Sequence, residues 1–219
     1  MCNLNATLCR KRVILCVLVV AGIANDSRAA AACADEPAPQ NEHRITDAME
    51  FVAGAASAFA VHEAGHLVFD VIFDASPYLK SVHFGPLPFF AIAHERALSP
   101  RREFAVSSAG FWTQQATSEW LLTRRPHLRD EHAPFAKGVF AFDVLTSVGY
   151  GIVAFARAGP VERDTRGIGA GVRIDERAIG AIVIAPALLD GYRYLNPDSR
   201  WARWASRAVK VGSVLLVVR

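Results

Sequence analysis

Apolar residues in this chain gather into segments of helical length that are separated by polar connections. The segment 51–73 is the strongest candidate for a membrane-spanning helix, because at about 1.5 Å per residue it can cross a hydrocarbon layer about 30 Å thick. The segments 104–122 and 135–156 also have helical length, although the first carries polar residues that would need protein neighbours in lipid. A fourth segment, 178–195, contains Pro186, which predicts a bend or break in its helix. The pattern predicts a mainly α fold, a multi-span membrane helix bundle.

The connections between these segments predict one small sheet and one loop. Proline, glycine and short apolar runs follow the first helix and predict a small β-hairpin with strands near 82–84 and 89–93. The segment 157–177 is rich in glycine and charge, which indicates a loop. The last stretch, 201–218, mixes tryptophan and basic residues with a short apolar tail, a composition typical of a helix at a membrane interface.

The N-terminus has the order of a secretory signal peptide. Basic residues at 10–12 precede an apolar run at 13–24, and an Ala-x-Ala sequence follows at 32–34. This order predicts a mature protein that starts near Asp35. An uncleaved anchor is the alternative, although the apolar run is shorter than the roughly 20 residues of a spanning helix.

The chain therefore divides into a signal peptide or N-terminal anchor at 1–34, a polar linker at 35–46 and a membrane-embedded domain at 47–219. All four cysteines lie in the first of these segments. A mature chain would contain no cysteine, which excludes disulfide bonds and thiolate chemistry.

Composition supports a membrane protein and excludes a nucleic-acid partner. Hydrophobic residues make up 52% of the 219 residues, and the mean hydropathy of +0.21 is above that of a typical soluble protein. The net charge is only +3, and the arginines are scattered through connecting segments, so no basic face is visible. We expect a multi-pass location with the lipid bilayer as a partner.

The candidate chemistry lies in "VHEAGH" within the first apolar segment. His62 and His66 are four residues apart, so on a helix they share a face and can bind one metal ion, with Glu63 beside a metal-bound water. Ionisable groups in an apolar segment are costly unless they are paired or bind an ion. Asp70 is about 12 Å along the axis from His62, too far for the same ion, and is interpreted as a packing carboxylate.

Two histidines leave a zinc site one protein ligand short. Three distant acids lie in or at the edge of apolar segments, and Asp190, Asp143 and Glu119 are all candidates. Asp190 is the best placed of them, because a break at Pro186 and a turn at Gly191 could direct its carboxylate inward.

Three motifs in one order carry a family resemblance. "VHEAGH" on an apolar helix, then "SSAGFWTQ", and finally "PALLDG" within 51–195 resemble the site-2 protease family of intramembrane zinc metalloproteases. The resemblance implies one Zn²⁺ per chain with His62, His66 and Asp190 as ligands, and Glu63 as the general base.

The middle motif departs from the family pattern. The resemblance implies that Gly110 and Gln114 pack near the site, but Phe111 stands where the family often has proline, and Gln114 replaces an asparagine. These departures concern the contacts that position a peptide more than the zinc ligands.

The resemblance implies a zinc-dependent endopeptidase that hydrolyses peptide bonds of membrane proteins. Its substrate would bind in an extended form, against a strand near 82–84. Two other classes of protein remain open. One is a membrane-associated zinc peptidase of another lineage that uses Glu119 as third ligand, and the other is a non-catalytic membrane scaffold that retains the motif.

Overall fold

The structure of the chain is a computed structural model, and it describes residues 40–84, 87–159 and 163–215. The chain divides into two units, Met1–Arg44 and Ile45–Arg219. The fold and the sites below are those of the second unit.

The predicted N-terminal segments are only partly covered by the structure. The signal peptide or anchor at 1–34 and the start near Asp35 lie outside the described residues. The segment 35–46, predicted as a polar linker, is helical from Gln40 onward.

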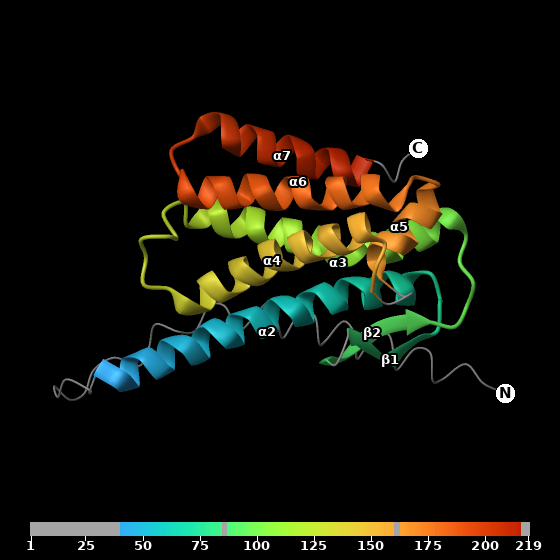
Figure 1. The fold of residues 1–219 in the computed structure, drawn as a ribbon, viewed down its shortest axis with the longest axis horizontal. Helices are drawn as coiled ribbons and strands as arrows, with labels where there is room; N and C mark the ends of the chain where they lie inside the picture. The colour runs from blue at the N-terminus through green and yellow to red at the C-terminus, as the bar shows by residue number, and fades with distance from the viewer. Residues whose placement is uncertain (1–39, 85–86, 160–162, 216–219) are drawn as a thin grey trace. The chain divides into compact units, whose positions relative to one another are not determined.

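Helices dominate the described chain, and one antiparallel hairpin follows the first of them (Figure 1). The elements in chain order are α2 (Gln40–Ile72), β1 (Pro77–Phe84), β2 (Leu87–His94), α3 (Pro100–Arg124), α4 (Pro134–Ala156), α5 (Asp164–Val172), α6 (Glu176–Leu195) and α7 (Arg200–Leu215). The predictions of a mainly α fold and of a hairpin after the HExxH helix are confirmed. The two strands pair from Pro77 opposite His94 to Phe84 opposite Leu87.

Two helices of the described chain, α4 and α6, are long and apolar enough to cross a membrane. The helix predicted as the strongest spanning candidate, 51–73, forms most of α2 but is not one of these two. Its two histidines, its glutamate and Asp70 lower its hydropathy, and all four are buried inside the protein.

The segment 157–177, predicted as a loop, contains the helix α5. Its glycines are packing positions, because Cβ atoms at Gly167 and Gly171 would press against Ser107 and Phe104 of α3. The glycines that indicated a loop in the sequence therefore let a short helix lie close to α3. The loop prediction is wrong here, and the same helix supplies part of the site described below.

The predicted break at Pro186 does not occur, and α6 continues through it to Leu195. Proline in a helix loses one backbone hydrogen bond. The helix α6 packs against α4 and α7, and these contacts favour the continuous helix. Asp190 and Gly191 therefore lie on regular helical backbone, which corrects the expectation of a turn at Gly191.

The helix α2 is held by very close contacts with α4. A Cβ at Gly54 would overlap the backbone carbonyl of Phe135, and a Cβ at Gly138 would overlap that of Phe51. Small residues at such a crossing let two backbones touch. Apolar clusters complete the interior, one between α3, α5 and α6 around Phe104.

Candidate metal centre

His62 and His66 lie one turn apart on α2, and both imidazoles are buried. Their Nε2 atoms are 3.2 Å apart. The predicted shared face is confirmed, since residues four apart on a helix project in the same direction.

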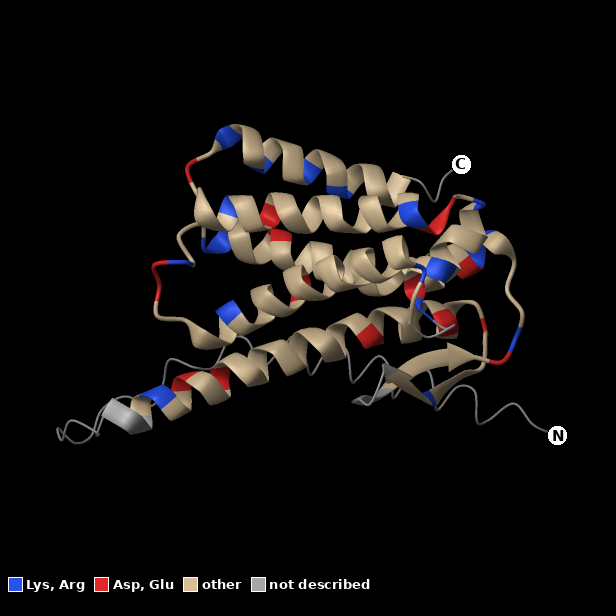
Figure 2. Ribbon diagram, in the orientation of Figure 1, with Lys and Arg blue, Asp and Glu red and all other residues tan. Residues whose placement is uncertain are grey.

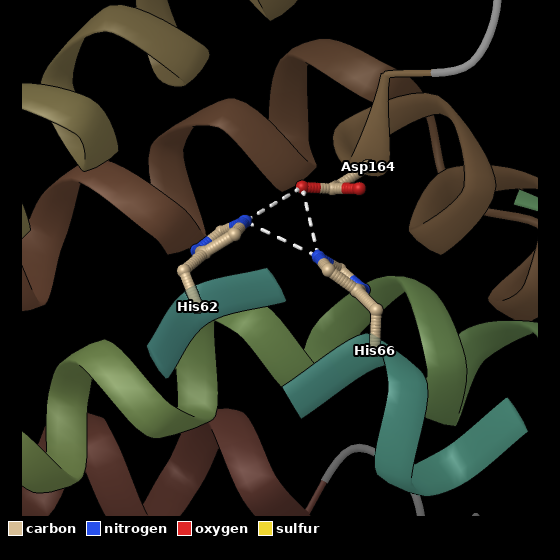
Figure 3. Close-up of side chains that lie close together, drawn as sticks. All are labelled: His62, His66 and Asp164. Atoms are coloured by element: carbon tan, nitrogen blue, oxygen red, sulfur yellow. Dashed lines mark hydrogen bonds and ion pairs between the residues drawn. The ribbon is translucent and has the colours of Figure 1, made fainter. Parts of the chain in front are cut away.

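The third group at this site is Asp164, the first residue of α5 (Figure 3). One of its carboxylate oxygens, Oδ2, is 3.4 Å from His62 Nε2 and 3.5 Å from His66 Nε2. A single oxygen thus faces both imidazole nitrogens. We refer to His62, His66 and Asp164 as the metal centre.

A hydrogen bond to the backbone fixes the orientation of the His66 imidazole. His66 Nδ1 is 2.8 Å from the carbonyl oxygen of Val106, which can only accept a hydrogen bond, so Nδ1 carries the proton. In the neutral imidazole the lone pair is then on Nε2, which faces Asp164. Asp164 Oδ2 is buried and has no hydrogen-bond partner among the described residues.

The surroundings of Asp164 favour the ionised form of its carboxyl group. Burial would by itself raise its pKa, but the nearby imidazoles of His66 and His62 outweigh burial and hold that pKa well below its ordinary value. The three residues offer one ligand atom each to a metal ion.

The three ligand atoms have the spacing that zinc requires. With Zn–N and Zn–O bonds of about 2.0–2.2 Å, neighbouring ligand atoms of a tetrahedral site are about 3.3–3.6 Å apart. The observed separations are 3.2, 3.4 and 3.5 Å. A proton fits less well, because one proton serves only one pair of atoms and draws it to about 2.7–2.9 Å. Three protein ligands leave the fourth position open, as in catalytic zinc sites.

Gly110 of α3 makes room for the two imidazoles. A Cβ on this residue would overlap the ring of His62 and come within 2.6 Å of His66 Nε2. The structure therefore brings Gly110 of the predicted middle motif to the metal centre. Gln114, one turn further along α3, is buried.

Glu63 lies beside the metal centre and is not one of its three closely spaced groups. It is largely buried and interacts electrostatically with His66, His62 and Asp164. The backbone N–H of Ile92 on β2 donates a hydrogen bond to Glu63 Oε2 at 3.3 Å. The carboxylate is thus held next to the candidate ligands without joining them.

Asp190, the predicted third ligand, lies elsewhere in the structure. Lys210 Nζ of α7 is 2.8 Å and 2.7 Å from its two carboxylate oxygens, and the Ser206 hydroxyl donates a hydrogen bond to Oδ1 at 2.6 Å. The expectation that Asp190 would join the histidines depended on a helix break that is absent. Its carboxylate is instead neutralised between α6 and α7.

The other candidate acids are also engaged away from the histidines. Glu119 accepts hydrogen bonds from Arg193, Arg207 and Lys210. Asp143 accepts a hydrogen bond from the Ser118 hydroxyl at 2.9 Å.

Asp70 is a packing carboxylate, as its distance from His62 along the helix predicts. It lies 3.2 Å from His94 Nδ1 of β2, which links α2 to the hairpin.

Sequence reasoning missed Asp164. This aspartate stands in a glycine-rich, charged segment, and attention went to acids in apolar segments. One signal was present, because aspartate is favoured in the first turn of a helix and "DTRGIGAGV" can form a short helix that begins with it.

Comparison of the chain with protein families, with curated proteins and with solved structures finds no significant match. The function of the protein is therefore inferred from the geometry of the metal centre and its surroundings.

Proposed function

We propose that this chain is a membrane-embedded, zinc-dependent endopeptidase that hydrolyses peptide bonds of membrane proteins. The observation that carries the proposal is the metal centre, three buried ligand atoms at tetrahedral spacing with a glutamate beside them. In this proposal His62, His66 and Asp164 hold one Zn²⁺, and Asp164 takes the place that the sequence assigned to Asp190.

Glu63 has the chemistry of a general base in this setting. Zinc, when bound, supplies a Lewis acid that polarises a carbonyl and lowers the pKa of water to about 7. The carboxylate of Glu63 accepts a proton from the attacking water and passes it to the leaving amine. The two histidines and Asp164 hold their positions during these transfers. His66 is bound to the carbonyl of Val106, and all three side chains are largely buried between helices.

The exterior of several helices supports a membrane location. Large apolar side chains face outward, with Leu145 of α4 68% exposed and Leu188 of α6 61% exposed. Figure 2 shows the stretches of α4 and α6 that carry no charged residue. Large exposed apolar side chains on helices of this length suit lipid contact.

The buried faces of α4, α6 and α7 also carry charged residues, which fits a bundle in lipid. Asp143 on α4, Asp190 on α6 and Lys210 on α7 are all buried. On α7 the outward side chains include Trp201 and Trp204, which suit the boundary between lipid and water. Charged groups inside a membrane protein normally face the bundle interior and pair with one another, as Asp190 and Lys210 do.

The hairpin lies where a substrate backbone could meet the base. Ile92 directs its N–H to Glu63 and not to β1, so the outer edge of β2 faces Glu63. The sequence placed an extended substrate against residues 82–84, which belong to β1. In this proposal the substrate lies near β2, because β2 is the strand in contact with the base.

The test is cleavage by wild type and by Glu63→Gln. Each is co-expressed with single-span membrane proteins, and fragments are compared after confirming equal zinc content. We expect Glu63→Gln to keep zinc and fold while its cleavage rate falls roughly 10²–10⁴-fold, since only the proton acceptor is lost. Equal cleavage by both proteins would contradict the role of Glu63. Bound zinc without cleavage of any substrate by wild type would favour a non-catalytic protein.

A further inference from the structure

The two residues that flank Asp164 are bound to one carboxylate. Arg163 donates hydrogen bonds to Glu176 through Nε at 2.6 Å and through a terminal nitrogen at 2.8 Å. The hydroxyl of Thr165 donates to the same carboxylate at 3.0 Å. Glu176, the first residue of α6, therefore holds the chain on both sides of the candidate ligand.

These contacts are shielded from water. The side chains of Arg163 and Glu176 are 9% and 13% exposed, and Thr165 is fully buried. Paired hydrogen bonds between a guanidinium and a carboxylate are strong and fix geometry, and they are little screened when buried. The neighbouring pair Arg157–Asp175 differs, because its side chains are 55% and 53% exposed.

The helix that carries Asp164 depends on tertiary contacts. The nine residues of α5 include three glycines, and a helix this short is marginal without tertiary contacts. Asp164 Oδ2 also lacks a hydrogen-bond partner among the described residues that would fix its direction. Packing against α3 holds the body of α5, and the contacts of the side chains that flank Asp164 hold its first turn.

We propose that Glu176 is a positioning residue for the metal centre. By holding Arg163 and Thr165 it fixes the backbone of Asp164, so that Oδ2 is presented to both histidines before an ion arrives. Glu176 itself does not touch the ion. This inference rests on the metal centre in the proposed function, and it is independent of whether a peptide bond is cut.

The test is the zinc affinity of Glu176→Gln in detergent-purified full-length chain, measured by competition with a chromophoric chelator. We expect the affinity to fall about 10–100-fold, the usual effect of losing a group that orients a ligand. Asp175→Asn is the matched control, since it removes one negative charge from the adjacent residue. Asparagine is also a good helix cap, and the pair that it breaks is exposed, so wild-type affinity is expected.

The absorption spectrum of the Co²⁺-substituted protein separates positioning from general stability. A displaced Asp164 changes the coordination and therefore the visible bands of Glu176→Gln, whereas lower stability alone leaves the bands of the folded fraction unchanged. Thr165→Val, which has nearly the same shape, should also weaken zinc binding. Thr165→Ser keeps the hydroxyl and should bind as wild type. If Glu176→Gln does not fold, the comparison of Thr165→Val with Thr165→Ser decides whether the contacts of Glu176 position Asp164.

Wild-type affinity and an unchanged Co²⁺ spectrum in folded Glu176→Gln would overturn the inference, as would equal affinity of Thr165→Val and Thr165→Ser. Wild type that binds no zinc would overturn both the metal centre and this role. Wild type that binds zinc without cleaving membrane proteins would contradict the endopeptidase alone, and the affinities would still decide the role of Glu176.

Discussion

Two buried polar clusters lie among these helices, and they differ in how their carboxylates are balanced. In the metal centre, Asp164 Oδ2 faces two imidazole nitrogens. In the second cluster, formed by Glu119, Asp190, Arg193, Ser206 and Lys210, each carboxylate contacts at least one ammonium or guanidinium group. We call this second group the ion-pair cluster.

The comparison shows how to tell a ligand from a structural acid. A carboxylate that already has a cationic side chain gains little from a metal ion, because its charge is neutralised and its lone pairs are used. A carboxylate whose close neighbours are imidazoles can bind a metal ion together with them, because a neutral imidazole offers a lone pair. Asp190 belongs to the first kind and Asp164 to the second, so removal of each should have a different consequence: loss of stability in one case and loss of metal in the other.

Lys210→Met tests the ion-pair cluster and has the largest expected effect on stability. It removes the cation closest to Asp190 and leaves that buried carboxylate without its main partner. We expect a loss of about 3–5 kcal/mol in the free energy of unfolding, the cost of breaking a buried ion pair. The measurement is thermal or denaturant unfolding in detergent, with zinc content determined in parallel on the folded protein.

Zinc content should stay at the wild-type level in folded Lys210→Met. The control is Arg96→Met, which breaks the exposed pair with Asp74 and should cost about 1 kcal/mol or less. A stable Lys210→Met protein that has lost its zinc would show that the two clusters are not separate.

Gly110→Ala tests the metal centre. In contrast to Lys210→Met, it should lower zinc binding. The new methyl group would overlap the imidazole of His62, so the two histidines could no longer take their present positions. We expect zinc affinity to fall about 100-fold, the upper end of what disturbing a ligand's support costs. The measurement is competition with a chromophoric chelator.

Gly191→Ala is the matched control for Gly110→Ala. Gly191 also lies on a helix, and a Cβ there meets no atom within 4 Å. Alanine should leave zinc binding unchanged and raise stability by about 0.5–1 kcal/mol, as glycine is the poorer helix former. Equal zinc affinity of Gly110→Ala and Gly191→Ala would mean that the histidines do not need the space at Gly110.

The features that the sequence predicts correctly depend on the spacing of residues close together in the chain. The helix that carries His62 and His66, their common face and the hairpin after it follow from residues close together in the chain. Gly110 was placed near the site through a family resemblance, and the structure puts it there.

The third ligand could not be predicted in the same way, because it depends on contacts between distant segments. Asp190 looked suitable because its apolar segment made an acid unusual, but Lys210, twenty residues further along, accounts for its burial. Asp164 resembles a loop residue in the sequence, because the glycines after it are compatible with a flexible loop or with close helix packing. Their contacts with α3, which show close packing, are seen only in the structure. Pro186 predicts a break for a similar reason, since the packing that tolerates proline inside α6 is not visible in sequence.

The most direct test of the central claim is the zinc content of Asp164→Asn beside that of Asp190→Asn. Both proteins are purified in detergent, checked for folding, and analysed by mass spectrometry of metals, with His62→Ala as the zinc-free reference. The account predicts about one zinc per chain in wild type and in Asp190→Asn, and almost none in Asp164→Asn. Full zinc in folded Asp164→Asn, or its loss from folded Asp190→Asn, would contradict the assignment of Asp164 as the third ligand.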